Sequence, residues 1–166
     1  MDRFYIHAEK IMKKTNTKNF KKTLSKFVTG ITVVCVKKNN QLYGKTVNSF
    51  NSLSLKPPLV LFSLGNYSSS LDVFIKSKYL SINILSNKQK KISDCFSGKK
   101  PDTDNLDFYE INENTYYINE CIANLECELI QKIKKGDHII FINKVLGVKY
   151  NDKLKPLSYF NSKFYK

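Results

Sequence analysis

The chain has 166 residues, near the size of one ordinary domain, and its 42% hydrophobic and 13% aromatic content excludes a disordered protein. The formal net charge is +14, but Arg3 is the only arginine, and nucleic-acid sites favour the planar arginine fork. Because the lysines are scattered along the chain, we favour a solvated basic surface and expect no nucleic-acid partner.

Cysteine and histidine spacing argues against a metal site. The four cysteines form no CxxC pair, and the two histidines stand in no metal-ligand spacing with them. We therefore expect no metal and, without a secretory signal, reduced thiols in the cytoplasm. Apolar runs stay far below the roughly 20 residues that span a bilayer, so we expect no membrane partner.

Two short helices are predicted at the N-terminal end. Residues 3–14 suit a basic amphipathic helix, and we expect residues 1–18 to be a helical extension of one domain spanning residues 19–166. A second helix is expected to begin at a cap formed by Asn16 or Thr17 and to end at Gly30. Its apolar face contains Phe20, Leu24, Phe27 and Val28.

Strands follow in quick succession. ITVVCVK is β-branched, and Asn39–Asn40 offers a hairpin turn into a strand from about Leu42 to Leu55. Lys56-Pro57-Pro58 ends that strand, because proline donates no ladder hydrogen bond. The next run, residues 59–64, is apolar on both faces and predicts a central buried strand.

The second half of the chain alternates between short helices and strands. Helices are predicted after the serines of GNYSSS and over Gln89 to Phe96, with a strand over residues 79–85 between them and an irregular segment over residues 97–113. ANLECELIQKI and HIIFINKVLGVKY predict a long hairpin joined by Lys135-Gly136-Asp137. Hairpin-linked strands favour a mainly β antiparallel barrel with peripheral helices, and the absence of GxGxxG and P-loop motifs argues against a Rossmann site.

Two segments carry unusual numbers of hydroxyl groups. GKTVNSFNSLSLKPP, residues 44–58, places small polar side chains at alternate positions, which suits either a solvent-facing strand or a strand that lies against a ligand ring. Asn66-Tyr67-Ser68-Ser69-Ser70 opens a helix, where free N–H groups and hydroxyls can bind a phosphate or simply cap the helix. The residues alone leave both alternatives open.

Several runs occur together in an order that resembles the flavin reductase family with the FMN-binding split barrel. These runs are GITVVCV, GKTVNSFNSLSLKPPLVLFSL, SSSL, YLSINILSNKQKKISDCF, LEC, GDHIIFINKV and PLSYF. The resemblance implies an antiparallel split barrel, a homodimer, and hydride transfer from NADH or NADPH to FMN, with FAD possible. Reduced flavin would pass to an acceptor such as a monooxygenase or ferric iron. A non-enzymatic FMN-binding electron carrier of the same fold is the alternative.

The resemblance also implies roles for individual residues, with no catalytic acid or base among them. The flavin ring would lie against Thr46, Val47, Asn48 and Ser49. The ribityl–phosphate end would lie along Ser52, Ser54 and the segment Asn66, Ser68, Ser69 and Ser70, with Lys91 neutralising phosphate charge. His138 would face the nicotinamide, although a histidine beside a turn is more often a plain surface residue. Tyr159 would close the same pocket, or else seal the barrel or contact a second subunit.

Overall fold

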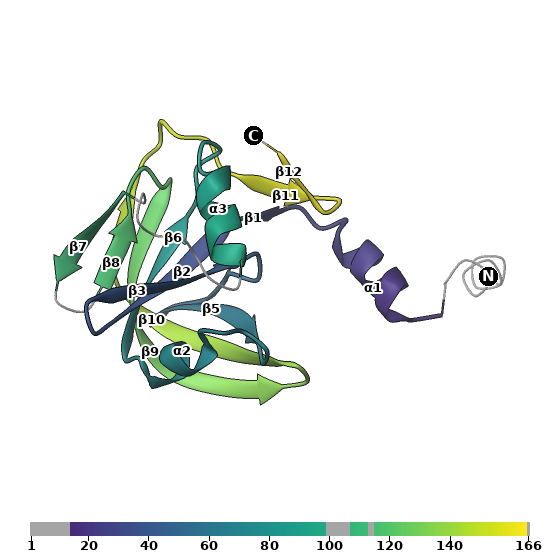
Figure 1. Ribbon diagram of the computed structural model, residues 1–166, viewed down its shortest axis with the longest axis horizontal. Helices are drawn as coiled ribbons and strands as arrows, with labels where there is room; N and C mark the ends of the chain where they lie inside the picture. The colour runs from purple at the N-terminus through teal and green to yellow at the C-terminus, as the bar shows by residue number, and fades with distance from the viewer. Residues whose placement is uncertain (1–13, 99–106, 113–114, 166) are drawn as a thin grey trace.

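The fold is mainly β, as the sequence predicts (Figure 1). The computed structural model describes residues 14–98, 107–112 and 115–165. The predicted helix over residues 3–14 lies almost wholly outside these ranges. The elements are α1 (Thr17–Leu24), β1 (Thr29–Gly30), β2 (Thr32–Lys38), β3 (Gln41–Val47), β4 (Asn51–Leu55), β5 (Pro58–Gly65), α2 (Leu71–Lys76), β6 (Tyr79–Ile84), α3 (Lys90–Ser97), β7 (Phe108–Asn112), β8 (Thr115–Ile118), β9 (Ala123–Lys135), β10 (His138–Tyr150), β11 (Ser158–Phe160) and β12 (Lys163–Tyr165).

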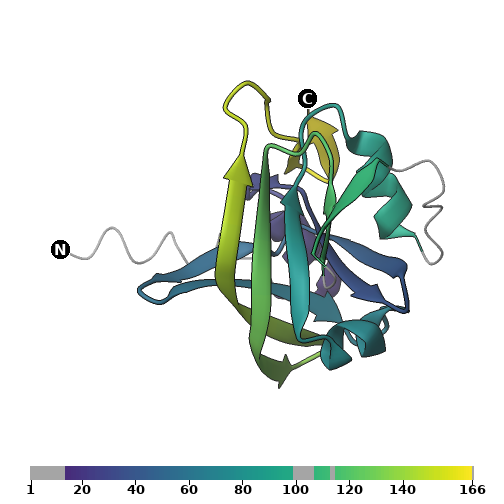
Figure 2. The same ribbon diagram turned by 90° about the vertical axis from the view of Figure 1, so that its left-hand side faces the viewer.

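The main sheet is antiparallel and has seven strands in the order β3-β2-β6-β9-β10-β5-β4. Figure 2 shows β6, β9 and β10 side by side on the outside of the curled sheet. The two edge strands, β3 and β4, follow one another in the chain. The Ser49 hydroxyl in their connection bonds to the backbone of Ser63 in β5, so the two ends of the sheet meet, as in a split barrel.

The barrel core is built around three aromatic rings that pack against one another. Phe62 of β5 and Phe141 of β10 are cross-strand partners with ring centroids 5.0 Å apart and nearly parallel planes. Phe74 of α2 meets both rings edge-on at 6.4 Å. All three side chains are fully buried, so α2 is held against the barrel by aromatic packing.

A second, smaller core lies on the other face of β2. Residues 32–36 of this strand are all buried, so Val34 and Val36 pack in the barrel while Val33 and Cys35 pack in the second core. Phe96 of α3 and Ile118 of β8 complete this second core. A run of TVVCV with no polar face therefore reflects a strand covered on both sides.

A buried asparagine joins four strands of the fold. Asn83 of β6 donates to the carbonyl of Val33 in β2 at 3.0 Å, and its Oδ1 accepts from the backbone N–H of Ile118 in β8 at 3.0 Å. The same oxygen accepts from Asn124 Nδ2 in β9 at 2.9 Å. Buried amides need such partners, so this network fixes how β8 docks on the sheet.

Several sequence-based expectations are confirmed and others are wrong. Asn16 caps α1 as predicted, and α2, β6, α3 and the β9–β10 hairpin form where expected. The helix ends at Leu24 rather than Gly30, which lies in β1. The boundary predicted between residues 18 and 19 falls inside α1, and the division into extension and domain stays a prediction.

The larger errors concern strand continuity. The strand expected from Leu42 to Leu55 is two strands, because the chain leaves the sheet at residues 48–50. β5 is second from the sheet edge and buries alternate residues only, whereas we expected a central strand buried on both faces. Within the segment expected to be irregular, residues 108–112 form β7, which pairs with the unpredicted β8.

Candidate functional site

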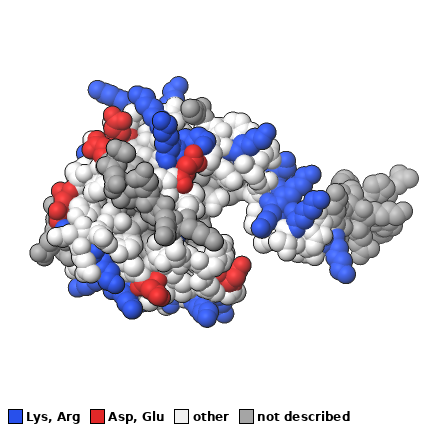
Figure 3. Space-filling model, in the orientation of Figure 1, with Lys and Arg blue, Asp and Glu red and all other residues white. Residues whose placement is uncertain are grey.

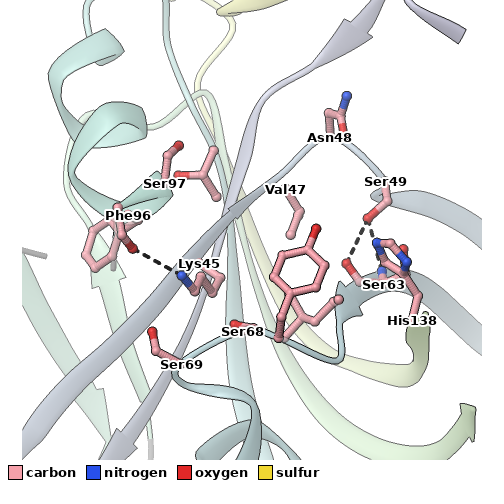
Figure 4. A pocket seen from close by; sticks show the side chains of 15 residues that line it. Lys45, Val47, Asn48, Ser49, Ser63, Ser68, Ser69, Phe96, Ser97 and His138 are labelled. Atoms are coloured by element: carbon pink, nitrogen blue, oxygen red, sulfur yellow. Dashed lines mark hydrogen bonds between the residues drawn. The ribbon is translucent and has the colours of Figure 1, made fainter. Parts of the chain in front are cut away.

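A cavity of about 560 Å³ opens where the end of β3, the start of the β10 strand, the β5–α2 loop and the end of α3 converge. Its size is that of a small-molecule site. Figure 4 shows Lys45, Phe96 and Ser97 at one end, Ser49, Ser63 and His138 at the other, and Val47 between them. The lining residues are Lys45, Thr46, Val47, Asn48, Ser49, Ser63, Leu64, Gly65, Tyr67, Ser68, Ser69, Phe96, Ser97, Gly98 and His138.

The wall formed by residues 46–49 is held by two side-chain hydroxyls. Thr46 Oγ1 donates to the carbonyl of Ser93 in α3 at 2.7 Å. Ser49 Oγ accepts from the backbone N–H of Ser63 at 3.0 Å and lies 3.2 Å from its carbonyl oxygen. These bonds anchor both ends of the wall where the chain leaves the sheet after Val47.

The end of the cavity at α3 carries a positive charge. Lys45 Nζ donates to the carbonyl of Gly98, the C-cap residue of α3, at 3.1 Å. Phe96 packs against the strand beside it because Gly44 has no side chain; a Cβ there would lie 2.5 Å from the Phe96 ring. The ammonium group has further donors, so it suits an anionic part of a ligand.

The β5–α2 loop contributes an unsatisfied hydroxyl. The backbone N–H of Ser68 donates to the carbonyl of Gly65 at 3.0 Å, which forms a tight turn at the cavity. The Ser68 hydroxyl is buried and has no hydrogen-bond partner among the described residues. Leaving a buried hydroxyl without a partner costs free energy, so a polar ligand atom in the cavity would fit this position.

His138 begins β10 and lies directly opposite Gly65 of β5. Its side chain is 42% exposed, and Nδ1 lies 2.6 Å from Asp137 Oδ1. The hydrogen bond from His138 lowers the pKa of the Asp137 carboxyl, which therefore stays ionised at neutral pH. The carboxylate orients the imidazole and leaves Nε2 available to a ligand.

Seven of the residues predicted to bind cofactors line this cavity and six do not. Those that line it are Thr46, Val47, Asn48, Ser49, Ser68, Ser69 and His138. Ser52 and Ser54 lie in β4, away from the cavity, because the strand breaks before them. Asn66 donates to the Gly136 carbonyl in the β9–β10 turn, Ser70 precedes α2, and Lys91 is exposed on α3. Tyr159 lines a second cavity.

Sequence reasoning missed Lys45, Ser63, Tyr67, Phe96 and Ser97. Lys45 lies inside GKTVNSFNSLSLKPP and Tyr67 inside GNYSSS, so both belong to segments that the sequence singles out, although neither was assigned a role there. Ser63 and the end of α3 reach the cavity only through sheet closure and helix docking, for which the sequence carries no local signal.

Buried cysteines take no part in this site. Burial raises the pKa of Cys121 and Cys127 to about 12 and also raises the pKa of Cys35.

The described residues contain no group of histidines, cysteines and acids that could hold a metal ion. Across the same residues, helices long and apolar enough to cross a membrane are absent.

We therefore expect selective alkylation of the native protein. Iodoacetamide at pH 8 should modify Cys95, which is partly exposed, and spare the three buried thiols, because the thiolate is the reactive form. Peptide mass spectrometry would detect the modified positions. Unfolding in guanidinium should expose all four cysteines to the reagent. Rapid native labelling of Cys35, Cys121 or Cys127 would contradict the packing described above.

Comparison with known proteins gives consistent matches. The family described as "Flavin reductase like domain" matches residues 24–166. FMN reductase (NADH) SmoA of Agrobacterium fabrum is 35% identical over 137 residues, covering 82% of this chain and 79% of the relative. The flavin-dependent monooxygenase reductase subunit HsaB of Mycobacterium tuberculosis is 31% identical over 140 residues, covering 84% and 75%.

A solved structure shares the same fold. The NADH:FAD oxidoreductase SgcE6 of Streptomyces globisporus, in complex with NAD and FAD fragments, superimposes with a TM-score of 0.86 at 26% identity. The superposition covers 93% of this chain and 96% of that chain. The arrangement of strands and peripheral helices is therefore shared over nearly the whole length.

Proposed function

Because the chain belongs to the flavin reductase-like family, we propose that it oxidises NADH or NADPH and reduces FMN, with FAD as the alternative flavin. The observation that carries this proposal is the cavity between residues 46–49 and the β5–α2 loop, with an unsatisfied serine hydroxyl on one side and a histidine at one end. When bound, the nicotinamide supplies the hydride and the flavin ring accepts it.

The residues of this chain would bind and orient these groups. In the proposal, residues 46–49 present backbone groups and small side chains to the flavin ring, and Ser68 and Ser69 donate hydrogen bonds to its polar chain. Lys45 provides positive charge at the α3 end of the cavity. His138, oriented by Asp137, binds the nicotinamide. Positioning two rings in contact is the main contribution a protein makes to hydride transfer.

The proposed acceptor of the reduced flavin is a flavin-dependent monooxygenase. HsaB, which is similar over 84% of this chain, is named as the reductase subunit of such an enzyme. Ferric iron is the alternative acceptor. Mixing the reduced protein with a ferric chelate under anaerobic conditions would test iron directly, and an unchanged flavin spectrum would exclude it.

We also propose a homodimer, because exposed apolar side chains on α1 and just after it are left uncovered. Figure 1 shows α1 standing away from the barrel, and none of its residues is buried. Figure 3 shows lysines gathered over this helix, but Phe20, Leu24, Phe27 and Val28 are also more than half exposed. A cavity of about 780 Å³ between this region and the barrel is lined by Leu24, Phe27, Val28, Phe50 and Tyr159, among others. A second copy of the chain would cover this surface.

The dimer is tested by changing the apolar side of α1. Leu24→Glu should shift the protein from twice the mass of one chain to the mass of a single chain in analytical ultracentrifugation. Lys22→Glu, an equally drastic change two residues earlier on the same helix, should leave the dimer intact. A wild-type protein that sediments as a monomer at micromolar concentration would contradict the dimer.

The enzyme itself is tested by flavin binding and reduction. The purified protein should quench the fluorescence of added FMN, and stopped-flow mixing of the flavin-bound protein with NADH should bleach the flavin absorbance near 450 nm, at about one flavin per nicotinamide oxidised. If flavin binds but stays oxidised with both NADH and NADPH, the electron-carrier alternative holds. If no flavin binds, both functions are excluded.

A further inference from the structure

Tyr67 is an aromatic side chain that lines the cavity and yet is 83% exposed. Its ring lies on the backbone of Gly65: a Cβ built on that glycine would be 2.7 Å from Tyr67 Cε1 and 2.8 Å from Cζ. Only a glycine permits this approach. The position of the ring therefore depends on the absence of a side chain at residue 65.

The ring of Tyr67 is otherwise unsupported. Among the described residues, none forms a hydrogen bond with its hydroxyl, and the ring forms no aromatic pair. The ring approaches Gly65 through Cε1, Cζ and the hydroxyl, and most of its surface is exposed. Gly65 lies directly opposite His138, and Ser68, the residue after Tyr67, carries the unsatisfied hydroxyl. The exposed aromatic face therefore stands among the polar groups of the cavity.

We propose that Tyr67 stacks on a planar heteroaromatic ring of a bound cofactor, either the isoalloxazine or the nicotinamide. This proposal rests on the proposed function and adds a residue that determines ring affinity. Aromatic faces attract one another by dispersion and quadrupole interactions, and burial of the exposed face removes apolar surface from water. The hydroxyl has no role in the interaction, so phenylalanine should replace tyrosine without loss.

A tryptophan probe tests the contact without relying on catalysis. The chain contains no tryptophan, so Tyr67→Trp introduces a single indole at this position. Its fluorescence should be quenched by FMN or by NAD⁺, which cannot donate a hydride, and the quenching ligand identifies the ring that stacks. Tyr150→Trp, at the far end of β10 and also largely exposed to solvent, is the control. Equal quenching of the two variants by both ligands would overturn the proposal.

Affinity measurements provide the second test. Tyr67→Ala should weaken the binding of one ring by about 2- to 12-fold, the loss expected for one aromatic pair, and Tyr67→Phe should bind as the wild type does. The affinity for FMN is measured by flavin fluorescence, and the affinity for NAD⁺ by equilibrium dialysis. If the wild type binds both ligands and Tyr67→Ala binds them equally well, the stacking proposal fails and the proposed function stands. If the wild type binds neither, the proposed function fails, and this proposal with it.

Discussion

Replacing Ser63 with tryptophan should abolish flavin binding and leave the barrel folded. Val60, Phe62 and Leu64 of β5 point into the core, whereas Ser63 lies on the opposite face, at the wall of the cavity. The hydrogen bonds of Ser49 go to the backbone of Ser63 and survive the change. An indole would occupy the space proposed for the cofactor. We expect the Kd for FMN to rise at least about 100-fold, or roughly 2.7 kcal/mol.

The control for this variant is Lys144→Trp. Lys144 is an exposed residue of β10, and its cross-strand partner in β5 is Leu59, four residues from Ser63. This variant carries the same indole on the same pair of strands and should bind FMN as tightly as the wild type. Circular dichroism would show that both variants keep the β-sheet signal. Undiminished FMN binding by Ser63→Trp would mean that the flavin lies elsewhere, and the proposed site would be wrong.

Asn83→Leu should be among the most destabilising single changes outside the aromatic core. The side chain is fully buried, and its amide satisfies groups on β2, β8 and β9. Leucine has a similar volume but leaves the Ile118 N–H without its acceptor and the Val33 carbonyl without one donor. Each unsatisfied buried group costs about 1–3 kcal/mol, so we expect the free energy of unfolding to fall by roughly 2–5 kcal/mol.

Urea denaturation followed by circular dichroism measures this loss. Gln131→Leu makes the same type of change at an exposed position of β9, where the side chain makes no hydrogen bond with a described residue. Surface substitutions of this kind change stability by about 0.5 kcal/mol or less. If Asn83→Leu lost less than about 1 kcal/mol, the buried amide network would contribute little to the docking of β8.

The sequence determined the elements whose signals are local. Asn16 caps α1 through its own side chain, and Gly136 supplies the positive φ that the β9–β10 turn requires. Both features act within a few residues, so they are readable without tertiary context. The resemblance to flavin reductases was likewise carried by short runs in a fixed order, and the family match over residues 24–166 confirms it.

The alternation of side chains along a strand does not predict the site residues beyond the bend at residues 48–50. The alternate small polar side chains of residues 44–58 share one face only while the strand is continuous. The chain leaves the sheet at residues 48–50, and the pairing of β4 with β5 shifts register between Ser52 and Ser54. Ser52 and Ser54 therefore lie on an edge strand away from the cavity.

By itself, the amino-acid sequence determined that this protein is a hairpin-rich β domain of the flavin reductase type with a polar, hydroxyl-rich segment after Gly44. Only the tertiary structure decided which side chains share a cavity. Lys45, Ser63, Tyr67 and Phe96 meet there because the sheet curls until β3 reaches β5, and because Gly44 and Gly65 let two aromatic rings pack against the backbone. Such contacts depend on loop closure and packing between distant segments, which no local pattern of residues encodes.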